Sequence, residues 1–133
     1  MSAIVVDTHT VLWYLFADPE LSRRAKAAME SATEEGEPIY VPTICIVEAT
    51  YLTEKNRIPA RKLELLRGAL LESGSAFEAM PLTTEIAFAL SRIARNEVPD
   101  LPDRVIAATA LALGLVLVTC DGKIRASGIE TLW

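Results

Sequence analysis

The residues of this chain that could carry out chemistry are acids placed where predicted strands end. Asp7 directly follows the apolar run at residues 3–6, and Asp121 follows shortly after a second apolar run at residues 115–118. In an α/β sheet, ligands bind at the carboxyl ends of the strands, so both carboxylates stand where such a sheet places its ligands. Taken alone, each Asp would more often be a turn former or a helix cap. Their joint position is what favours a functional site.

Three further acids are expected at the same edge. Asp103 falls in the first turn of an apolar helix, where the helix dipole tolerates an anion, and Asp100 lies just outside that turn. Glu48 is embedded in a helical segment, residues 45–49, whose other members are nearly all apolar. Each has a simpler explanation as well, because Asp103 could be only a helix-terminal charge and Glu48 could pair with Lys55.

A cluster of these acids predicts a site for a hard metal ion. Carboxylates gathered within a few ångströms repel one another by ~1–4 kcal/mol per close pair, so a fold that keeps them together is expected to do so for a reason. Oxygen ligands in a pocket with room for water suit Mg²⁺ or Mn²⁺ better than Zn²⁺. The four acids expected to converge are Asp7, Glu48, Asp103 and Asp121.

The overall charge argues mildly against a nucleic acid as substrate. The chain has 13 Lys and Arg residues against 18 Asp and Glu, a formal net charge of −5, whereas phosphate binding is driven by basic residues. Divalent cations bound among the acids would reverse the sign of that pocket. The total charge therefore does not exclude a nuclease.

The elements that must position these acids alternate between strand and helix. The expected strands are residues 3–6, 39–41, 77–82, 115–118 and 129–133. The expected helices cover residues 11–16, 22–32, 43–52, 63–70, 83–95 and 102–113, with Thr43 as an N-cap and Gly114 as a helix stop. This rhythm predicts an α/β fold, with a parallel sheet covered on both faces through right-handed crossovers.

Size and composition fit one cytoplasmic domain. A length of 133 residues is typical of a single domain, and the apolar stretch at residues 105–118 is shorter than the ~20 residues of a membrane helix. The N-terminus has no basic segment of the kind that begins a secretory signal. Cys45 and Cys120 fit neither a zinc site nor a disulfide framework, so both are expected to be reduced thiols.

Four segments together resemble a PIN domain. They are Ile4–Thr8 (IVVDT), the helix that carries Glu48, residues 100–110 (DLPDRVIAATA) and residues 117–121 (LVTCD). The chain most resembles the stand-alone PIN toxins of bacterial toxin–antitoxin pairs, the VapC group, and the match covers nearly its whole length. The resemblance implies a three-layer αβα sandwich with a central, mainly parallel sheet, and one nuclease domain over residues 1–133.

The same resemblance implies a metal-dependent endoribonuclease that uses Mg²⁺ or Mn²⁺ to hydrolyse RNA. The residues that match the family's metal ligands are Asp7, Glu48, Asp103 and Asp121. Thr8 and Thr119 match hydroxyls that orient the carboxylates or a water, while Asp100 and Arg104 match supporting positions, and Arg104 could also simply neutralise the acids. A homodimer held inactive by a cognate antitoxin protein is expected. Cys120 departs from the pattern, because its position is expected to hold a small residue.

Other functional interpretations remain open. A phosphatase of the haloacid-dehalogenase type also has an Asp after its first strand, but it needs a second Asp where this chain has His9. A PIN-like module that binds RNA or protein without catalysis would not need the complete set of acids. His9 could be a general base, although a helix would turn it away from Asp7. The aromatic run at residues 13–16 could stack on bases but favours core and interface, and the basic groups at residues 23–26 and 55–62 could guide RNA or be solvated helix faces.

Overall fold

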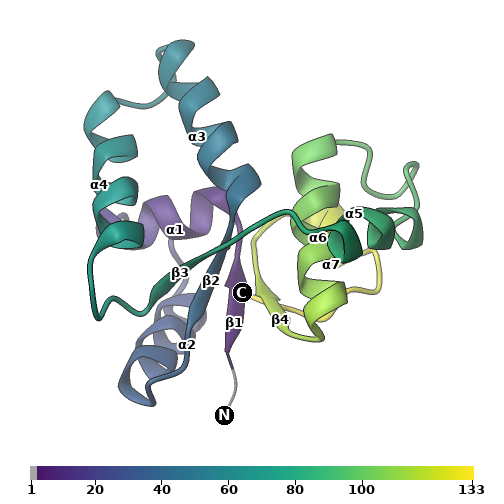
Figure 1. Cartoon of the computed structure of the whole chain (residues 1–133), viewed down its shortest axis with the longest axis horizontal. Coiled ribbons are helices and arrows are strands. Elements are labelled where there is room, and N and C mark those ends of the chain that lie inside the picture. The colour runs from purple at the N-terminus through teal and green to yellow at the C-terminus, as the bar shows by residue number, and fades with distance from the viewer. Residues whose placement is uncertain (1–2) are drawn as a thin grey trace.

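The computed structural model describes residues 3–133 as an alternation of strands and helices (Figure 1). The strands are β1 (Ile4–Val6), β2 (Ile39–Pro42), β3 (Phe77–Met80), β4 (Val116–Val118) and β5 (Thr131–Leu132). The helices are α1 (Thr8–Leu15), α2 (Arg23–Glu34), α3 (Thr43–Glu54), α4 (Ala60–Leu71), α5 (Thr84–Ala89), the 3₁₀ helix η1 (Leu90–Arg92), α6 (Leu101–Leu113) and α7 (Gly122–Arg125). The strands form one sheet in the order β3-β2-β1-β4-β5, and every neighbouring pair is parallel. The predicted α/β fold with a parallel sheet is confirmed.

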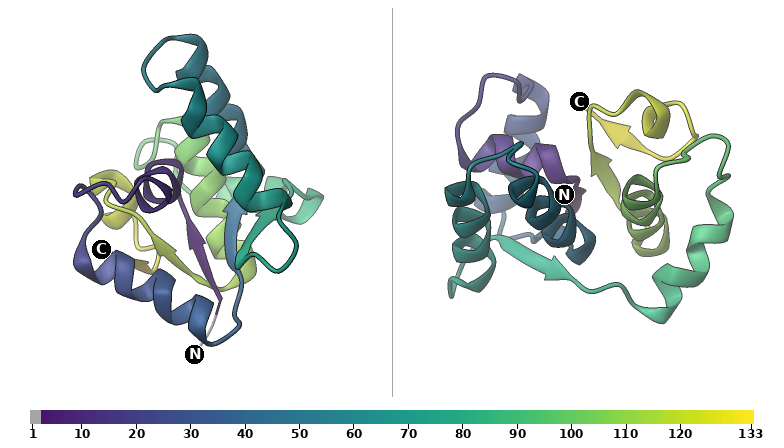
Figure 2. Two further views of the ribbon diagram at one scale, coloured as in Figure 1. Left: turned by 90° about the vertical axis from the view of Figure 1, so that its left-hand side faces the viewer. Right: turned by 90° about the horizontal axis from the view of Figure 1, so that it is seen from above.

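Helices cover the sheet on both faces. Figures 1 and 2 show α1 to α4 on one side of the sheet and α5 to α7 on the other. This division follows from right-handed crossovers, because the chain moves from β1 outward to β3 and then returns across the sheet to β4. The central strands are consequently buried on both faces, and Val5, Val6, Ile39, Val41 and Leu117 have no exposed surface. The expected three-layer αβα sandwich is confirmed.

The register of β1 and β4 brings the ends of these strands together. Val6 pairs with Val118, so Asp7 and Thr119 directly follow two residues that lie side by side. The Asp7 backbone N–H also donates to the Val118 carbonyl at 3.4 Å. Two segments more than a hundred residues apart in sequence thus meet at the carboxyl edge of the sheet.

Helix α6 fits closely against the sheet because its buried face is built from small residues. Ala107, Ala108 and Ala110 are buried, and α6 contacts both β1 and β4. The helix ends at Gly114, whose φ of 66° lies in the left-handed region that glycine adopts without strain. The Gly114 helix stop predicted from the sequence is confirmed.

Two local predictions were wrong. Thr43 is the first residue of α3 and not its cap, because β2 runs directly into the helix and Pro42 takes the cap position without a side-chain hydrogen bond. The helix expected to reach Arg95 ends at Ala89 and continues only as η1. The backbone becomes extended at Ile93, and this change of direction allows the Ile93 side chain to be buried in the core.

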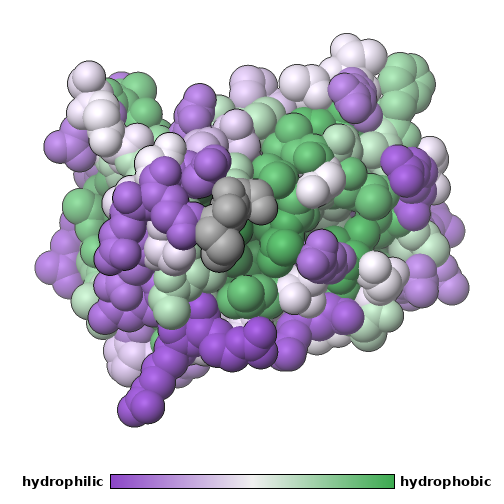
Figure 3. Space-filling model, turned by 90° about the horizontal axis from the view of Figure 1, so that it is seen from below, coloured by the Kyte–Doolittle hydropathy of each residue, from purple (hydrophilic) through white to green (hydrophobic). Residues whose placement is uncertain are grey.

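The face at the amino ends of the strands is divided between apolar and charged surface. Seen from below, apolar residues gather in the middle and on the side of α6, whereas the side of α2 is mostly hydrophilic (Figure 3).

Among residues 3–133, no helix is long and apolar enough to cross a lipid bilayer. The acids singled out in the sequence lie at the opposite edge of the sheet, where β1 and β4 end.

Candidate active site

A cavity of about 580 Å³ opens at the carboxyl edge of the sheet and gathers the predicted acids. It is lined by Asp7, Thr8, His9, Glu48, Asp100, Asp103, Cys120, Asp121, Gly122 and Lys123. The structure therefore brings the four predicted metal ligands into one cavity, together with Thr8 and Asp100. They come from the end of β1, from α3, from the start of α6 and from the segment after β4.

Asp7 is the most constrained of these acids. Its side chain is only 7% exposed, and both of its carboxylate oxygens accept hydrogen bonds. Oδ1 accepts from the backbone N–H of Thr10 at 3.0 Å, which makes Asp7 the N-cap of α1, and Oδ2 accepts from the Thr119 hydroxyl. The Thr10 hydroxyl in turn donates to the Val118 carbonyl at 3.0 Å. Asp7 thus joins the ends of β1 and β4 to the start of α1.

Two other acids of the cavity are also helix caps. Asp121 accepts from the Ile124 N–H at 2.9 Å and caps α7, a short helix that was not predicted from the sequence. Asp100 accepts from the Asp103 N–H at 3.1 Å and caps α6. The capping role weighed for a lone Asp and a position in the cavity are therefore compatible, because capping uses only one carboxylate oxygen.

Glu48 is held by a hydroxyl rather than by a helix end. The Thr8 hydroxyl donates to Glu48 Oε1 at 2.5 Å, across 40 residues of sequence. Thr8 is 2% exposed and Thr119 is fully buried, so both hydroxyls are fixed within the protein. Each predicted hydroxyl position therefore lies beside a carboxylate, with Thr119 directly behind Asp7.

Among the acids of the cavity, Asp103 has a strongly raised pKa. Burial, and after it the negative charges of Asp100, Asp121, Glu48 and Asp7, together raise the pKa of Asp103 from 3.8 to about 7. A carboxyl group surrounded by carboxylates loses its proton reluctantly, because ionisation adds one more repelling charge to the cavity. A cation in the cavity would reverse this cost.

Arg104 does not have the charge-neutralising role considered from the sequence. Its guanidinium turns to the main chain and donates from one nitrogen to the carbonyls of Leu90 and Ile93, at 3.0 and 2.9 Å. Its Nε is buried without a partner, and Arg104 is absent from the charges that set the pKa of Asp103. Arg104 instead anchors the end of η1 to α6, the helix that carries Asp103.

Comparison with protein families identifies the architecture. The model of the PIN domain matches residues 4–128, which is nearly the whole described chain. The chain belongs to the PIN domain family. Membership removes the haloacid-dehalogenase interpretation, because the family whose model matches nearly the whole chain is a different one.

Known relatives of this PIN domain include ribonucleases and toxin–antitoxin complexes. The chain is 28% identical over 125 residues to Ribonuclease VapC22 of Mycobacterium tuberculosis (strain ATCC 25618 / H37Rv), and the match covers 94% of this chain and 92% of the relative. A toxin–antitoxin complex from Klebsiella pneumoniae contains a chain with 26% identity and a TM-score of 0.67, covering 98% of this chain and 96% of that one. DNA-bound VapBC from Salmonella typhimurium gives 24% identity and a TM-score of 0.72, covering 99% and 98%.

Four lining residues of the PIN domain cavity were not assigned to the site from the sequence, namely His9, Cys120, Gly122 and Lys123. His9 and Lys123 are exposed at its wall, and Cys120 is an exposed free thiol between Thr119 and Asp121. The signal for His9 was its position two residues after Asp7. Lys123 gave no such signal, because it depends on the unpredicted turn of α7, which carries it to the cavity.

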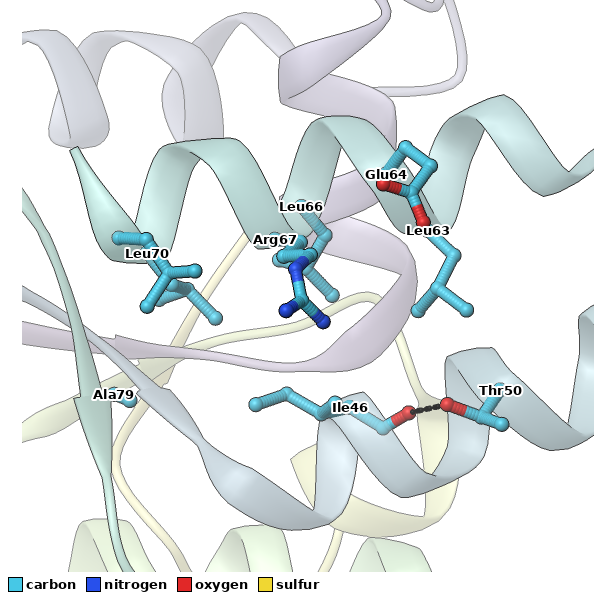
Figure 4. A pocket seen from close by; sticks show the side chains of 9 residues that line it. Ile46, Thr50, Leu63, Glu64, Leu66, Arg67, Leu70 and Ala79 are labelled. Carbon is cyan, nitrogen blue, oxygen red and sulfur yellow. Dashed lines mark hydrogen bonds between the residues drawn. The ribbon is translucent and has the colours of Figure 1, made fainter.

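A second cavity lies between α3 and α4 and lacks the features of a reaction centre. Its volume is about 360 Å³. Figure 4 shows Ile46 of α3 on one side of it and Leu63, Leu66 and Leu70 of α4 on the other. The Thr50 hydroxyl is already used, because it donates to the Ile46 carbonyl at 2.8 Å. Active sites need convergent polar groups as well as apolar walls. The acidic cavity meets that requirement and the apolar one does not.

The donor set of the acidic cavity fits a hard divalent cation that keeps part of its water. Within residues 3–133, no group of three or more His, Cys, Asp or Glu side chains is arranged to hold an ion by itself. Mg²⁺ usually retains several waters and takes only one or two carboxylates. A cavity of about 580 Å³ lined by carboxylates provides both the ligands and room for that water.

The raised pKa of Asp103 predicts how stability changes with pH. Between about pH 4 and pH 7 the folded chain holds a proton on Asp103 that the unfolded chain has released, so the free energy of unfolding falls as pH rises through this range. Asp103→Asn should flatten this dependence and raise the melting temperature above that of the wild type at pH 8. The measurement is a series of thermal melts in EDTA from pH 4 to pH 8.

Glu85→Gln is the matched control, because Glu85, like Asp103, is an acid in the first turn of a helix but is exposed and lies outside the cavity. It should retain the wild-type dependence on pH. An Asp103→Asn variant that loses stability with pH as steeply as the wild type would show that the pKa of Asp103 is not raised in the folded chain.

Proposed function

We propose that this PIN domain is a metal-dependent endoribonuclease, the toxin of a toxin–antitoxin pair, with residues 1–133 as one nuclease domain. The observation that carries the proposal is the cavity in which Asp7, Glu48, Asp103 and Asp121 meet, with hydrogen bonds that fix three of them. The 28% identity to a curated ribonuclease over 125 residues supports the same activity. A set of acids that crowds together at a cost in free energy is expected to serve a function.

We assign metal binding to those four acids, either by direct contact or through water that the ion retains, with Mg²⁺ or Mn²⁺ as the ion. A bound divalent cation would supply positive charge for the scissile phosphate and lower the pKa of an attacking water. The protein's part is to hold its carboxylates still. Thr10 and Thr119 fix both oxygens of Asp7, and Thr8 fixes Glu48, so the ligands need little reorganisation when the ion and substrate arrive.

The reaction that follows is hydrolysis by water. Its oxygen forms a new bond to phosphorus, the bond from phosphorus to the 3′ oxygen breaks, and that oxygen takes a proton. The products are a 5′-phosphate and a 3′-hydroxyl. An attack by the RNA 2′-hydroxyl would give a cyclic phosphate instead, so the chemistry of the ends distinguishes the two mechanisms.

Basic residues around the cavity would guide the RNA backbone. Lys123 lies on the cavity wall. At the junction of α3 and α4, Lys55 lies 5.0 Å from the centre of the Tyr51 ring, and Lys62 lies 4.8 Å from that of Phe16. This junction is at the same end of the molecule as the cavity, whereas α2, which carries the other basic group, is at the opposite end (Figure 1). Local positive charge of this kind offsets the net charge of −5.

Two protein partners belong to the proposal. The Klebsiella pneumoniae structure is a toxin–antitoxin complex, and we extend that arrangement to a cognate antitoxin for this chain. We also propose a homodimer, supported by apolar side chains left exposed on α3 and α5. Val47 is 61%, Tyr51 54% and Phe88 76% exposed. Trp13, in the aromatic run that the sequence analysis considered for an interface, is partly buried within the chain.

Cleavage of RNA by the purified protein tests the catalytic proposal. Mapping the 5′ ends of the products should show cuts that need Mg²⁺ or Mn²⁺ and that carry 5′-phosphates. Asp7→Asn should lower the rate by at least about a hundredfold, in line with the loss of a preorganised electrostatic group. Glu85→Gln should cut at the wild-type rate. Equal cutting by Asp7→Asn and the wild type would contradict the catalytic assignment of Asp7. No metal-dependent cutting by the wild type would favour the non-catalytic PIN-like module instead.

Light scattering tests the homodimer. At micromolar concentration the wild type should have the mass of two chains, and Val47→Lys or Tyr51→Lys should shift the mass toward one chain, because each buries an unpaired charge at the interface. Leu71→Lys is the control, since Leu71 is 72% exposed but lies at the far end of α4. A wild type that is monomeric at this concentration would contradict the proposal.

A further inference from the structure

An aromatic column stands beside the acidic cavity. His9 and Trp13 are four residues apart on one face of α1, and their rings are stacked with centroids 5.5 Å apart and an angle of 29° between the planes. The Trp13 ring in turn contacts Trp133, at 5.9 Å and 56°. Three rings from the two ends of the chain thus form one continuous contact.

His9 is the member of this column that reaches the reaction site. It is exposed and lines the cavity, while its neighbours Thr8 and Thr10 are buried. Trp13 covers one face of the His9 ring, so the remainder of the ring forms the cavity wall. The only histidine of the chain therefore presents a flat aromatic surface two residues from Asp7.

We propose that His9, supported by Trp13 and Trp133, is a base-stacking subsite for a single-stranded RNA nucleotide next to the scissile phosphate. This rests on the proposed nuclease function and adds a residue that positions substrate. Single-stranded RNA is recognised through unstacked bases that lie on aromatic side chains, including histidine. A base on His9 would extend the column by one more ring, while its phosphate reaches toward the carboxylates and Lys123.

The surroundings of His9 favour a nucleotide over a protein partner. The cavity that it lines is polar, with Asp7, Glu48 and Asp121 on its wall, and about 580 Å³ is within the range of small-ligand sites. None of the exposed large apolar side chains, which a protein partner would cover, lines this cavity. His9 offers a ring for the base next to the carboxylates, where the phosphate of the same nucleotide would lie.

The two tryptophans of the chain provide a direct optical readout, because both belong to this column. The experiment titrates the full chain, in Ca²⁺ to slow cutting, with a short oligoadenylate and with an abasic ribose-phosphate oligomer of equal length. Binding of oligoadenylate should quench the tryptophan fluorescence, and the abasic oligomer should bind more weakly without this quenching. His9→Leu should raise the Kd for oligoadenylate by roughly 5- to 100-fold, the range for loss of one base–aromatic stack.

His9→Phe is the decisive variant, since it keeps a stacking ring and removes the imidazole nitrogens. It should restore the wild-type Kd for oligoadenylate, and neither variant should change the Kd for the abasic oligomer. Equal weakening by Phe and Leu would overturn the subsite, and so would a wild type that binds both oligomers equally. A change of mass in light scattering with an unchanged Kd for RNA would place His9 in a protein interface instead.

This result is separable from the proposed catalysis. Base-dependent binding through His9 in a chain that cuts no RNA would sink the nuclease proposal and leave the subsite standing. Metal-dependent cutting with an oligoadenylate Kd that is insensitive to His9→Leu would remove the subsite alone. Thermal melts of both variants confirm folding, and an exposed position in α1 should tolerate either side chain.

Discussion

The site depends on one buried carboxylate that is hydrogen-bonded from two directions. Asp7 accepts from the backbone of Thr10, which starts α1, and from the hydroxyl of Thr119, which follows β4. A buried charge is tolerated only when its hydrogen bonds are satisfied. Because these bonds come from the ends of separate elements, the position of Asp7 follows from the parallel pairing of β1 and β4 and from the start of α1.

The same principle, with different partners, holds the other acids. Asp121 and Asp100 each use one oxygen to cap a helix, while Thr8 holds Glu48. The pKa of the Asp103 carboxyl group is raised by its burial and by the negative charges of these neighbours. Helix capping and hydrogen bonds from threonine hydroxyls thus hold these acids together, although their charges repel one another. A preorganised cluster of this kind is suited to neutralisation by a cation, and it explains why stability and activity would both respond to metal.

The sequence predicted the elements and the acids well because both follow local rules. Apolar periodicity located the five strands, and an acid after a strand pointed to the carboxyl edge of the sheet. Apolar periodicity could not locate α7, because a four-residue helix leaves no periodic pattern. Lys123 was missed as a cavity residue because it lies on this helix. The turn of Arg104 toward Leu90 and Ile93 depends on the end of η1, which is fixed by burial of Ile93 and not by local propensity. The contact between the Trp13 and Trp133 rings joins residues 120 positions apart, which no local pattern can reveal.

A thermal melt of EDTA-stripped protein titrated with Mg²⁺ or Mn²⁺ tests most directly whether the acids form one metal site. An ion that binds only the folded state adds about 2.7 kcal/mol at a hundredfold excess over Kd, a rise of several degrees for a domain of this size. The wild type and Glu85→Gln should both show this rise, at lower concentration of Mn²⁺ than of Mg²⁺. Asp7→Asn and Asp103→Asn should show much less. Equal shifts in the wild type and both site variants would mean that the ions bind elsewhere and would contradict the carboxylate site.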